Sequence, residues 1–501
     1  MGETVRRLRP AEWPLWRELR LRALADAPDA FGETLAEARA RDEAGWRDFA
    51  ARPDIVQLIA ERGGAPVGMT LAVIEAIDPA RAHLNAMWVA PEARGGGLGG
   101  ALLEAALRWS RGRAALELVL GVAEDNGPAR ALYERRGFRD TGEQRMLRDG
   151  AEIAIRVMAL RQLPLVMGVV NVTPDSFSDG GRYLDPAAAI DHGLALAADG
   201  ADLLDVGGEA TNPRAAPIDA REELRRVLPV IEALVAAGAT VSIDTTKAEV
   251  ARAAVAAGAA IVNDVSGGLF DPAMAEVLAD LDATYIAGHL RGASLAAVFA
   301  PEQAGAPPSW PEVAVELGQR LAALPPAVRA RAWVDPGVGF GKGADPESNL
   351  GLLRRAGELR LAVRRPVVVG PSRKRFLRRL LDGERGAVAA AAAGAAARGA
   401  AASSGATAQG AVTTGAAASG AAVSDVTAPG LAVSGVTAQD AVMQSATGRG
   451  VTASGVTAPD VMALDAATVG ACLGAVRGGA QVLRVHNVAL LRAALAVYTK
   501  I

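Results

Sequence analysis

Three polar side chains close apolar runs of the sequence and could together bind a ligand through hydrogen bonds. Asp244 lies at the end of TVSIDT, Asn263 near the end of AIVND, and Asp335 at the end of ARAWVD. Carboxylates are costly to bury unpaired, whereas a buried carboxylate that accepts hydrogen bonds from N–H groups is charge-assisted and strong. Each residue alone could equally be a solvated cap of a strand. Their recurrence at strand ends favours a binding site.

A glycine-rich run in the first third of the chain could bind an anion. It comprises residues 94–100, RGGGLGG, follows an apolar segment that ends before Pro91, and opens an amphipathic helical pattern. Glycines let backbone N–H groups approach an anion closely, and the N-terminus of a helix adds favourable dipole charge. A flexible turn is the alternative interpretation of the run taken alone.

The strand-end residues require a sheet that brings the carboxyl ends of its strands together. From residue 163 to about residue 383 the sequence repeats an apolar strand, a polar loop and an Ala- and Leu-rich helix, and QVLRVHN at 481–487 supplies an eighth strand. Near-continuous apolar strands are typical of a parallel sheet covered on both faces. Eight such units predict an α/β fold with a (β/α)8 TIM barrel, whose chemistry lies at the carboxyl ends of the strands.

The chain divides into three compositional zones. Residues 1–160 alternate short apolar runs with charged helical patterns and form one predicted domain, and residues 163–501 form the barrel. Residues 386–464 contain no aromatic residue, no Lys and no Glu, and SGVTAQD at 434–440 returns as SGVTAPD at 454–460. Such a segment buries little apolar surface, so we predict a disordered low-complexity insertion within the barrel; a partner-binding tail is the alternative.

Composition excludes several classes of function. The chain has 501 residues, half of them hydrophobic, and a net charge of −3, so it shows no basic field for nucleic acid. A single cysteine, Cys472, rules out a disulfide framework and a cysteine-based metal site. Polar residues and glycines interrupt the Ala-rich stretches, so no membrane span is expected, and the N-terminus lacks the apolar core of a signal peptide. We therefore expect a cytoplasmic protein.

Two motifs of the first domain resemble those of the Gcn5-related N-acetyltransferase (GNAT) family. Residues 83–103, which contain the glycine run, resemble its acetyl-CoA loop, and VAEDNGPARALYERRGF at 122–138 resembles its next motif. The resemblance implies a GNAT acyltransferase domain that binds acetyl-CoA through Arg94, Gly95, Gly97, Gly99 and Asn126. Tyr133 corresponds to the tyrosine that protonates the departing CoA thiolate. The acetyl acceptor and its general base are not marked; Glu75 is the nearest acidic residue on a central strand.

Seven motifs of the barrel resemble those of dihydropteroate synthase, an enzyme of folate biosynthesis. The first is NVTPDSFSDGG at 171–181, and the others follow in the family's order along residues 163–383 and 465–501. They are DVGGEATNP at 205–213, the strand ends at Asp244 and Asn263, DPGVGFGK at 335–342, SRK at 372–374 and RVH at 484–486. The resemblance implies condensation of 6-hydroxymethyl-7,8-dihydropterin diphosphate with p-aminobenzoate, which releases pyrophosphate.

The resemblance assigns polar and aromatic residues of the barrel to two substrate sites. The donors and acceptors of the pterin ring would pair with Asp244, Asn263, Asp335 and Lys374. Lys374 would also act in catalysis, because it flanks the aminobenzoate site. That second site would be formed by Thr211, Pro213, Phe340 and Phe177.

The leaving pyrophosphate would be held by Asn171, Arg484 and His486. Arg484 and His486 alternate along a strand and so project to one side. Asn171 would share the anion and a Mg²⁺ ion, which needs few protein ligands because it keeps several waters. The loop after Asn171 has the Pro, Gly and small polar residues of a lid, in which Asp175 would stabilise the cationic pterin methylene. The family resemblance also suggests a homodimer formed through the barrel.

The sequence departs from the dihydropteroate synthase pattern at three positions. Asn212 stands where Arg is common, Gly288 where Met is usual, and Asn487 where Asp usually follows the Arg-x-His motif. Two alternatives therefore stay open: a barrel that binds pterin with little or no synthase turnover, and a first domain that is degenerate or regulatory. A pterin-dependent methyltransferase is disfavoured, because methyl transfer has no pyrophosphate to hold.

Overall fold

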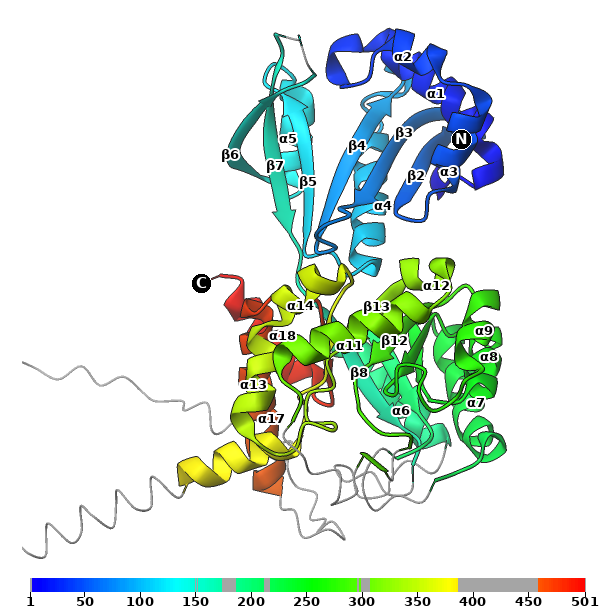
Figure 1. Cartoon of the computed structure of the whole chain (residues 1–501). Coiled ribbons are helices and arrows are strands. Elements are labelled where there is room, and N and C mark those ends of the chain that lie inside the picture. Colours follow the sequence, from blue (N-terminus) through cyan, green and yellow to red (C-terminus); the bar gives the residue numbers. More distant parts are fainter. Residues whose placement is uncertain are drawn as a thin grey trace, which may run out of the picture.

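A computed structural model describes residues 2–148, 150, 152–173, 186–210, 217–294, 297–298, 307–385 and 458–500. These residues form two α/β units, the first drawn above the second in Figure 1. Their named strands fall into one sheet of seven and one sheet of eight. The first sheet carries the glycine run of the sequence, and the second carries the polar strand ends.

The first unit is built on a mixed sheet with the strand order β1-β2-β3-β4-β5-β7-β6. Its strands are β1 (Glu3–Arg7), β2 (Ile55–Arg62), β3 (Ala65–Ile74), β4 (Arg81–Val89), β5 (Glu117–Ala123), β6 (Arg139–Met146) and β7 (Ala154–Arg161). Its helices include α1 (Trp13–Asp26), α2 (Leu35–Ala40), α3 (Glu43–Ala51), α4 (Leu98–Gly112) and α5 (Gly127–Arg135). Strands β4 and β5 are parallel, whereas their outer neighbours β3 and β7 run antiparallel to them.

Helix α4 follows from an apolar stripe in its sequence. Leu98, Leu102, Leu103 and Ala106 recur at helical spacing and are all buried. They join the core that Trp16 of α1 and the inward residues of the sheet also form. This packing fixes the N-terminus of α4, and with it the glycine run, beside strand β4.

The second unit is a ring of parallel strands in the order β13-β12-β11-β10-β9-β8-β15-β14. The strands are β8 (Leu165–Asn171), β9 (Leu203–Gly207), β10 (Val241–Asp244), β11 (Ile261–Asp264), β12 (Thr284–Gly288), β13 (Ala332–Asp335), β14 (Val368–Val369) and β15 (Val482–Val485). A parallel bridge between Val334 and Val367 joins β13 to the segment that leads into β14. It brings the two ends of the sheet together, so the expected (β/α)8 TIM barrel is confirmed.

Helices surround the barrel because its strands are apolar on both faces. They include α6 (Pro186–Ala198), α7 (Ala220–Ala236), α8 (Ala248–Ala256), α9 (Met274–Asp280), α11 (Trp310–Ala323), α12 (Pro326–Ala330), α13 (Pro346–Arg354), α14 (Ala356–Val363), α17 (Ala458–Arg477) and α18 (Val488–Tyr498). None of the described helices is long and apolar enough to cross a membrane.

The predicted insertion and the described helices overlap at one end. The sequence suggested an insertion from 386 to 464, whereas α17 begins at Ala458. The helix starts earlier because Leu464 is buried in the barrel core, and the preceding turns continue the same helix. Residues 386–457 lie outside the described residues. Helix α17 runs directly into β15, as expected for the last helix before the eighth strand.

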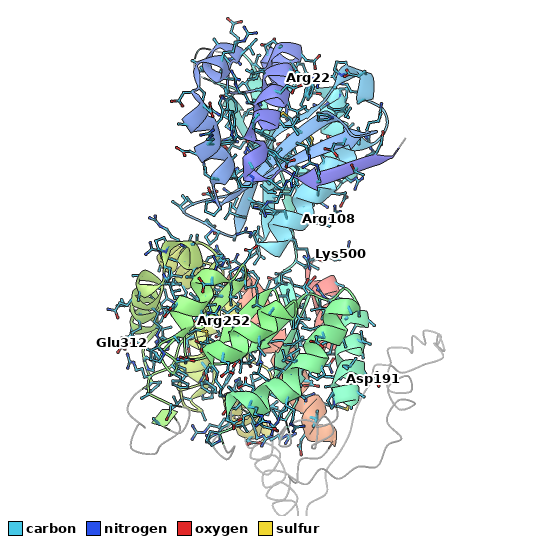
Figure 2. The ribbon with its side chains drawn as sticks, turned by 90° about the vertical axis from the view of Figure 1, so that its right-hand side faces the viewer. Arg22, Arg108, Asp191, Arg252, Glu312 and Lys500 are labelled. Carbon is cyan, nitrogen blue, oxygen red and sulfur yellow. The ribbon has the colours of Figure 1, made fainter. Side chains whose placement is uncertain are left out.

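The first unit is seated on the amino-terminal end of the barrel. Ala114, just after α4, packs in one apolar cluster with residues at or near the starts of barrel strands, such as Leu165 and Val482. Gln481 donates from Nε2 to the carbonyl oxygens of Ala114 (2.5 Å) and Pro79 (3.4 Å). Arg111 donates to Asp202 at 2.7 Å. In Figure 2, Arg108 of α4 and Lys500 also lie at this junction. The polar strand ends are therefore at the opposite end of the barrel from the first unit.

We expect Gln481→Leu to lower the stability of the chain without changing the chemistry of the barrel. Gln481 is fully buried, and its Oε1 also accepts a hydrogen bond from Val367 N–H. Each buried group left unpaired costs about 1–3 kcal/mol of unfolding free energy. Thermal denaturation should show a lower Tm than in the exposed control Gln144→Leu, and an unchanged Tm would contradict the role of this contact.

Candidate functional site

Polar residues from several strands converge on one pocket at the carboxyl end of the barrel. Its lining includes Asp244 of β10, Asn263 of β11, Asp335 of β13, Lys374 after β14, Arg484 of β15 and Phe340 after β13. Parallel strands end at the same edge of a sheet, which is why residues far apart in the sequence meet there. The structure thus brings together six of the residues selected from the sequence.

Arg484 is the centre of an ion-pair network in this pocket. Its guanidinium donates to Asp205 Oδ2 at 2.5 Å and to Asp244 Oδ2 at 2.7 Å. Asn263 Nδ2 donates to the same oxygen of Asp205 at 3.0 Å. One guanidinium therefore offsets two carboxylates that water does not reach freely.

Asp205 is a site residue that the sequence reasoning did not select. It lies inside strand β9 and is fully buried, and its Oδ1 has no hydrogen-bond partner among the described residues. A carboxylate within the apolar run LLDVG was the available signal, because an acid at such a position must be paired. Its partner, Arg484, is 279 residues away in the sequence, so the pairing was not evident from spacing.

Burial shifts the ionisation of the pocket residues. It raises the pKa of Asp244, against the effect of nearby Arg484, and raises the pKa of Asp335, against the Gly337 N–H that donates to it at 2.7 Å. Burial likewise lowers the pKa of Lys374. Burial therefore favours the neutral form of each of these three groups. A ligand with N–H groups and a carbonyl oxygen would satisfy the same side chains.

Lys374 and Phe340 form one wall of the pocket. The Lys374 Nζ lies 5.4 Å from the centre of the Phe340 ring. Gly339 has φ of 73°, and a Cβ there would lie 2.9 Å from Lys374 Cγ. A residue with a side chain is excluded at this position on both grounds. The turn thereby holds Phe340 directly against the lysine.

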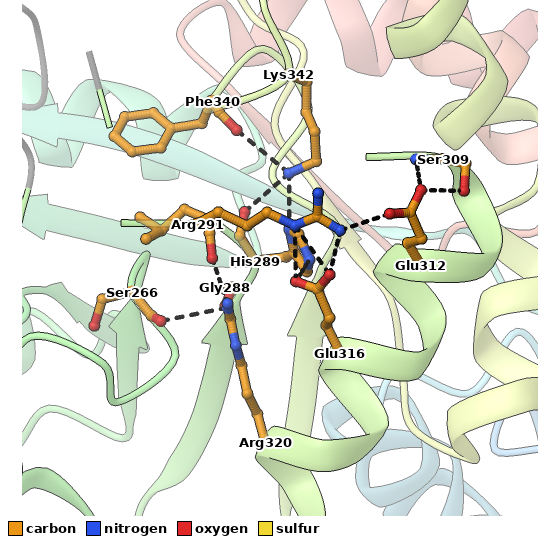
Figure 3. Close-up of polar contacts among 11 residues, drawn as sticks. Ser266, Gly288, His289, Arg291, Ser309, Glu312, Glu316, Arg320, Phe340 and Lys342 are labelled. Carbon is orange, nitrogen blue, oxygen red and sulfur yellow. Dashed lines mark hydrogen bonds and ion pairs between the residues drawn. The ribbon is translucent and has the colours of Figure 1, made fainter. Parts of the chain in front are cut away.

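A buried cluster behind this wall fixes the segment that carries Phe340. In Figure 3, Lys342 Nζ donates to His289 Nδ1 (2.9 Å) and to the Phe340 carbonyl (3.4 Å). His289 Nε2 in turn donates to Glu316 at 3.0 Å, which is also paired with Arg291. Burial lowers the pKa of Lys342 to about 7 and lowers the pKa of His289. The sequence reasoning did not single out this network.

His486 is half-buried beside Ser372 and does not line the pocket that Arg484 lines. Its Nδ1 lies 2.9 Å from Ser372 Oγ, within hydrogen-bond distance, and the same Oγ accepts from the His486 backbone N–H at 3.2 Å. Burial holds the pKa of His486 well below its usual range, and Arg373 lowers it further. The imidazole is therefore neutral at pH 7 and can contribute an N–H donor but no positive charge.

Asn171, at the end of β8, lies near Gly207 of β9 and Asp244 of β10. A Cβ at Gly207 would lie 3.9 Å from Asn171 Oδ1 and 3.8 Å from Asp244 Oδ2. These oxygens suit Mg²⁺, which prefers oxygen ligands and retains waters. No cluster of three or more His, Cys, Asp or Glu side chains suited to an ion occurs in the described parts of the chain. The residues present fit an ion held mostly by a bound diphosphate.

Two of the three departures from the dihydropteroate synthase pattern, Gly288 and Asn487, have structural reasons. A Cβ at Gly288 would lie 2.4 Å from Val265 O, so the Met usual in the family would not fit. Asn487 caps α18 and donates from Nδ2 to Asp465 Oδ2 at 3.1 Å, a bond that Asp could not donate. The third departure, Asn212, lies outside the described residues. So do four of the selected site residues: Asp175, Phe177, Thr211 and Pro213.

The glycine run lies at the start of helix α4 in the first unit. Gly97 is the N-cap of α4 with φ of 92°, and Gly95 has φ of 83°. Only glycine adopts such angles readily, and the first N–H groups of a helix lack partners within it. Arg94 donates from Nε to Val89 O at 2.9 Å and pairs with Asp26, so it fixes the loop to its surroundings. Gly99 lies in the first turn of α4.

A cavity of about 870 Å³ opens where strands β4 and β5 diverge. The two strands pair from Arg81–Leu84 with Glu117–Leu120, and their continuations line the cavity. In β4 the register with β3 shifts, and Ala86 has φ of 55° at this irregularity. The irregularity at Ala86 was not predicted from the sequence, because nothing in NAMWV marks a bulge.

Tyr133 and Asn126 also line this cavity. Burial raises the pKa of Tyr133 to about 12, so its hydroxyl stays protonated and can donate a proton to a thiolate. Asn126 Oδ1 accepts from Ala129 N–H at 3.2 Å and caps α5. Glu75 does not line the cavity and instead pairs with His83 at 3.1 Å.

Comparisons with known proteins agree with both halves of this description. The family described as "Pterin binding enzyme" matches residues 167–409, and the "Acetyltransferase (GNAT) family" matches residues 16–138. The dihydropteroate synthase of Mycobacterium leprae is 48% identical over 229 residues, which cover 44% of this chain and 78% of that protein. The chain belongs to the dihydropteroate synthase family.

Other members of the dihydropteroate synthase family show the same relationship. The type-2 enzyme of Escherichia coli is 41% identical over 229 residues, covering 45% of this chain and 83% of its own length. A structure of the Xanthomonas albilineans enzyme with 4-aminobenzoic acid is 32% identical, covers 68% of this chain and 95% of that chain, and has a TM-score of 0.45. The sequence matches to these enzymes and to the GNAT family show that the chain is a transferase of this family with an N-terminal GNAT domain.

Proposed function

We propose that the barrel of this chain joins 6-hydroxymethyl-7,8-dihydropterin diphosphate to p-aminobenzoate and releases pyrophosphate. The observation that carries this proposal is the convergence of Asp244, Asn263, Asp335, Lys374 and Arg484 on one pocket. Family membership supports it. The runner-up is a barrel that binds pterin without turnover.

In the proposed reaction the pocket orients the pterin for substitution at its methylene carbon. The carboxylates of Asp244 and Asp335 accept hydrogen bonds from the N–H groups of the ring, and Asn263 adds an amide. Lys374 donates to the pterin carbonyl. The arylamine nitrogen bonds to the methylene carbon, the bond from that carbon to the diphosphate oxygen breaks, and the nitrogen loses a proton. Orientation of both reactants is the main contribution of the protein.

The leaving diphosphate is stabilised by Arg484 and by groups around it. Arg484 pairs with two carboxylates through Nε and Nη2 and has further N–H donors that can bind the diphosphate. Neutral His486 contributes an N–H, and Asn171 offers an oxygen to Mg²⁺, which neutralises diphosphate charge when bound. We assign Phe340 with Thr211, Pro213 and Phe177 to aminobenzoate, and Asp175 to the developing positive charge, from sequence resemblance.

Calorimetric titration with the pterin diphosphate and Mg²⁺ tests the pterin site. We expect saturable binding, and p-aminobenzoate should bind more tightly once pyrophosphate and a pterin occupy the pocket. Absence of pterin diphosphate binding would refute the assignment of this pocket. A cytoplasmic location and dimerisation through the barrel complete the proposal.

For the first domain we propose acetyl transfer from acetyl-CoA to an amine. The acceptor nitrogen bonds to the thioester carbonyl carbon and loses a proton to solvent. The C–S bond breaks, the departing thiolate takes the proton of the Tyr133 hydroxyl, and Tyr133 regains a proton from solvent. The glycine run presents N–H groups at the start of α4 to the CoA pyrophosphate. The cavity between β4 and β5 is lined by Tyr133 and by Asn126, which caps α5.

Gly97→Val should weaken acetyl-CoA binding by at least about tenfold and leave the synthase reaction intact. Valine strains a backbone at φ of 92° by about 1–2 kcal/mol and displaces the N–H groups that bind the anion. Calorimetric titration with acetyl-CoA measures the loss. Gly112→Val, at the other end of α4, is the control, and equal affinities of the two variants would contradict the proposed loop.

A further inference from the structure

The cavity of the first domain has a wall of aromatic side chains, which we call the acceptor wall. It is formed by Trp16 of α1, Phe31 and the α3 residues Trp46 and Phe49. Trp16, Phe31 and Trp46 are at most 5% exposed, so they are held in place by the core. Arg41 lies over the Trp46 and Phe49 rings, 4.5 and 5.6 Å from their centres, so this lining is both aromatic and cationic and favours a flat ligand that carries an anionic group.

Positive charge outweighs negative charge around this wall. Arg20 and Arg41 share a single carboxylate, Glu33, at 3.0 and 2.7 Å. The other acid that lines the cavity, Glu37, is engaged with Thr34 in the cap of α2. A third guanidinium, that of the exposed Arg145, lines the cavity and forms no ion pair with any described residue. An anionic group on a ligand would complement this wall.

Arg20 is the residue best placed to hold that anion. It is 9% exposed, and its guanidinium lies 4.6 Å from the centre of the Phe31 ring. Its Nη1 atom is buried without a hydrogen-bond partner among the described residues, and the same holds for Trp46 Nε1. Unpaired buried donors are unfavourable. A small turn of the guanidinium would bring Nη1 to a ligand, and such side-chain changes commonly accompany binding.

We propose that the acetyl acceptor of the first domain is an amine that carries a carboxylate on an aromatic or similarly flat apolar frame. Arg20 binds the carboxylate, the acceptor wall packs on the frame, and the amine faces the thioester. This inference rests on the proposed acetyl transfer. In the reaction the amine nitrogen gains the acetyl group and loses a proton to solvent, and CoA leaves with the proton of Tyr133. Arylamine carboxylates and aromatic amino acids share the required chemistry, whereas cationic polyamines do not.

The experiment measures CoA release by the full-length chain from acetyl-CoA and matched pairs of amines. The arylamine pair is 4-aminobenzoate and 4-aminobenzamide, and the alkylamine pair is phenylalanine and phenylalaninamide. In at least one pair we expect kcat/KM to be about 10- to 100-fold higher for the carboxylate, the size of one charge-assisted hydrogen bond. The better pair identifies the source of the acceptor.

Variants assign the preference to Arg20. Arg20→Gln should reduce the carboxylate preference to about threefold or less, whereas Arg17→Gln, exposed on the same helix, should retain it. Arg145→Gln is exposed and removes no packing, and it should lower the preference about 2- to 5-fold. Acetyl-CoA affinity, measured by calorimetry, should be unchanged in all three.

The outcomes separate this inference from the acetyl transfer on which it rests. If kcat/KM for the neutral amides equals or exceeds that for the carboxylates, the proposed carboxylate on the acceptor is wrong. If Arg20→Gln keeps the full preference for carboxylates over amides, the role of Arg20 is wrong. Acetyl-CoA binding without CoA release from any of the four amines overturns the acceptor class alone. Failure to bind acetyl-CoA overturns the acetyltransferase itself.

Discussion

Arg484→Met should reduce synthase kcat/KM at least about 100-fold and also destabilise the barrel. The substitution removes the group that we assign to the leaving diphosphate, and it leaves Asp205 and Asp244 without their cation. Breaking a buried ion pair from one side typically costs about 3–5 kcal/mol, because the remaining charge is uncompensated. Denaturant unfolding and steady-state rates measure the two effects.

A double substitution separates the two effects of Arg484. Adding Asp205→Asn to Arg484→Met removes one buried charge and should recover part of the stability, while the synthase rate stays low. Arg477→Met, exposed on α17, is the control for loss of an arginine. Recovery of the rate together with the stability would show that Arg484 acts on folding alone.

Lys374→Met should lower synthase kcat/KM by about 10- to 100-fold with a smaller change in stability. Methionine keeps the aliphatic contact with Gly339 and Phe340 but cannot donate to the pterin carbonyl. A buried charge-assisted hydrogen bond contributes about 1.5–3 kcal/mol, which sets this range. Arg375→Met alters the exposed neighbour and should have no effect. A normal rate in Lys374→Met would remove this lysine from the site.

Much of the barrel site could be predicted from the sequence because strand ends are local features. Asp244, Asn263 and Asp335 each close an apolar run, and a parallel barrel necessarily gathers such ends on one face. The glycine run predicted the start of α4 in the same way, since positive φ angles require glycine. In both cases a short stretch of sequence specifies the geometry.

Features that depend on pairing between distant residues could not be read in this way. Asp205 becomes a site residue only through Arg484, and Lys342 acquires its role from His289, 53 residues away. Burial also sets the charge state of His486, which is neutral at pH 7 because its pKa is held well below its usual range. The contact of Ala114 with the amino-terminal end of the barrel likewise depends on the packing of two domains.

The packing of the first domain on the barrel keeps the two proposed sites apart. The first domain covers the amino-terminal end of the barrel, whereas the pocket with Arg484 and Lys374 lies at the carboxyl end. A product of one site must therefore leave into solvent before it reaches the other. We accordingly expect independent rates at the two sites, coupled through the shared stability of the chain.

The most direct test of the barrel assignment is to incubate the full-length chain with the pterin diphosphate, p-aminobenzoate and Mg²⁺. Mass spectrometry would quantify 7,8-dihydropteroate, and an enzymatic assay would quantify pyrophosphate. We predict equal amounts of the two products, formed over many turnovers and only when the arylamine is present. Tight binding of the pterin diphosphate without 7,8-dihydropteroate formation would contradict the proposed synthase and favour a pterin-binding barrel.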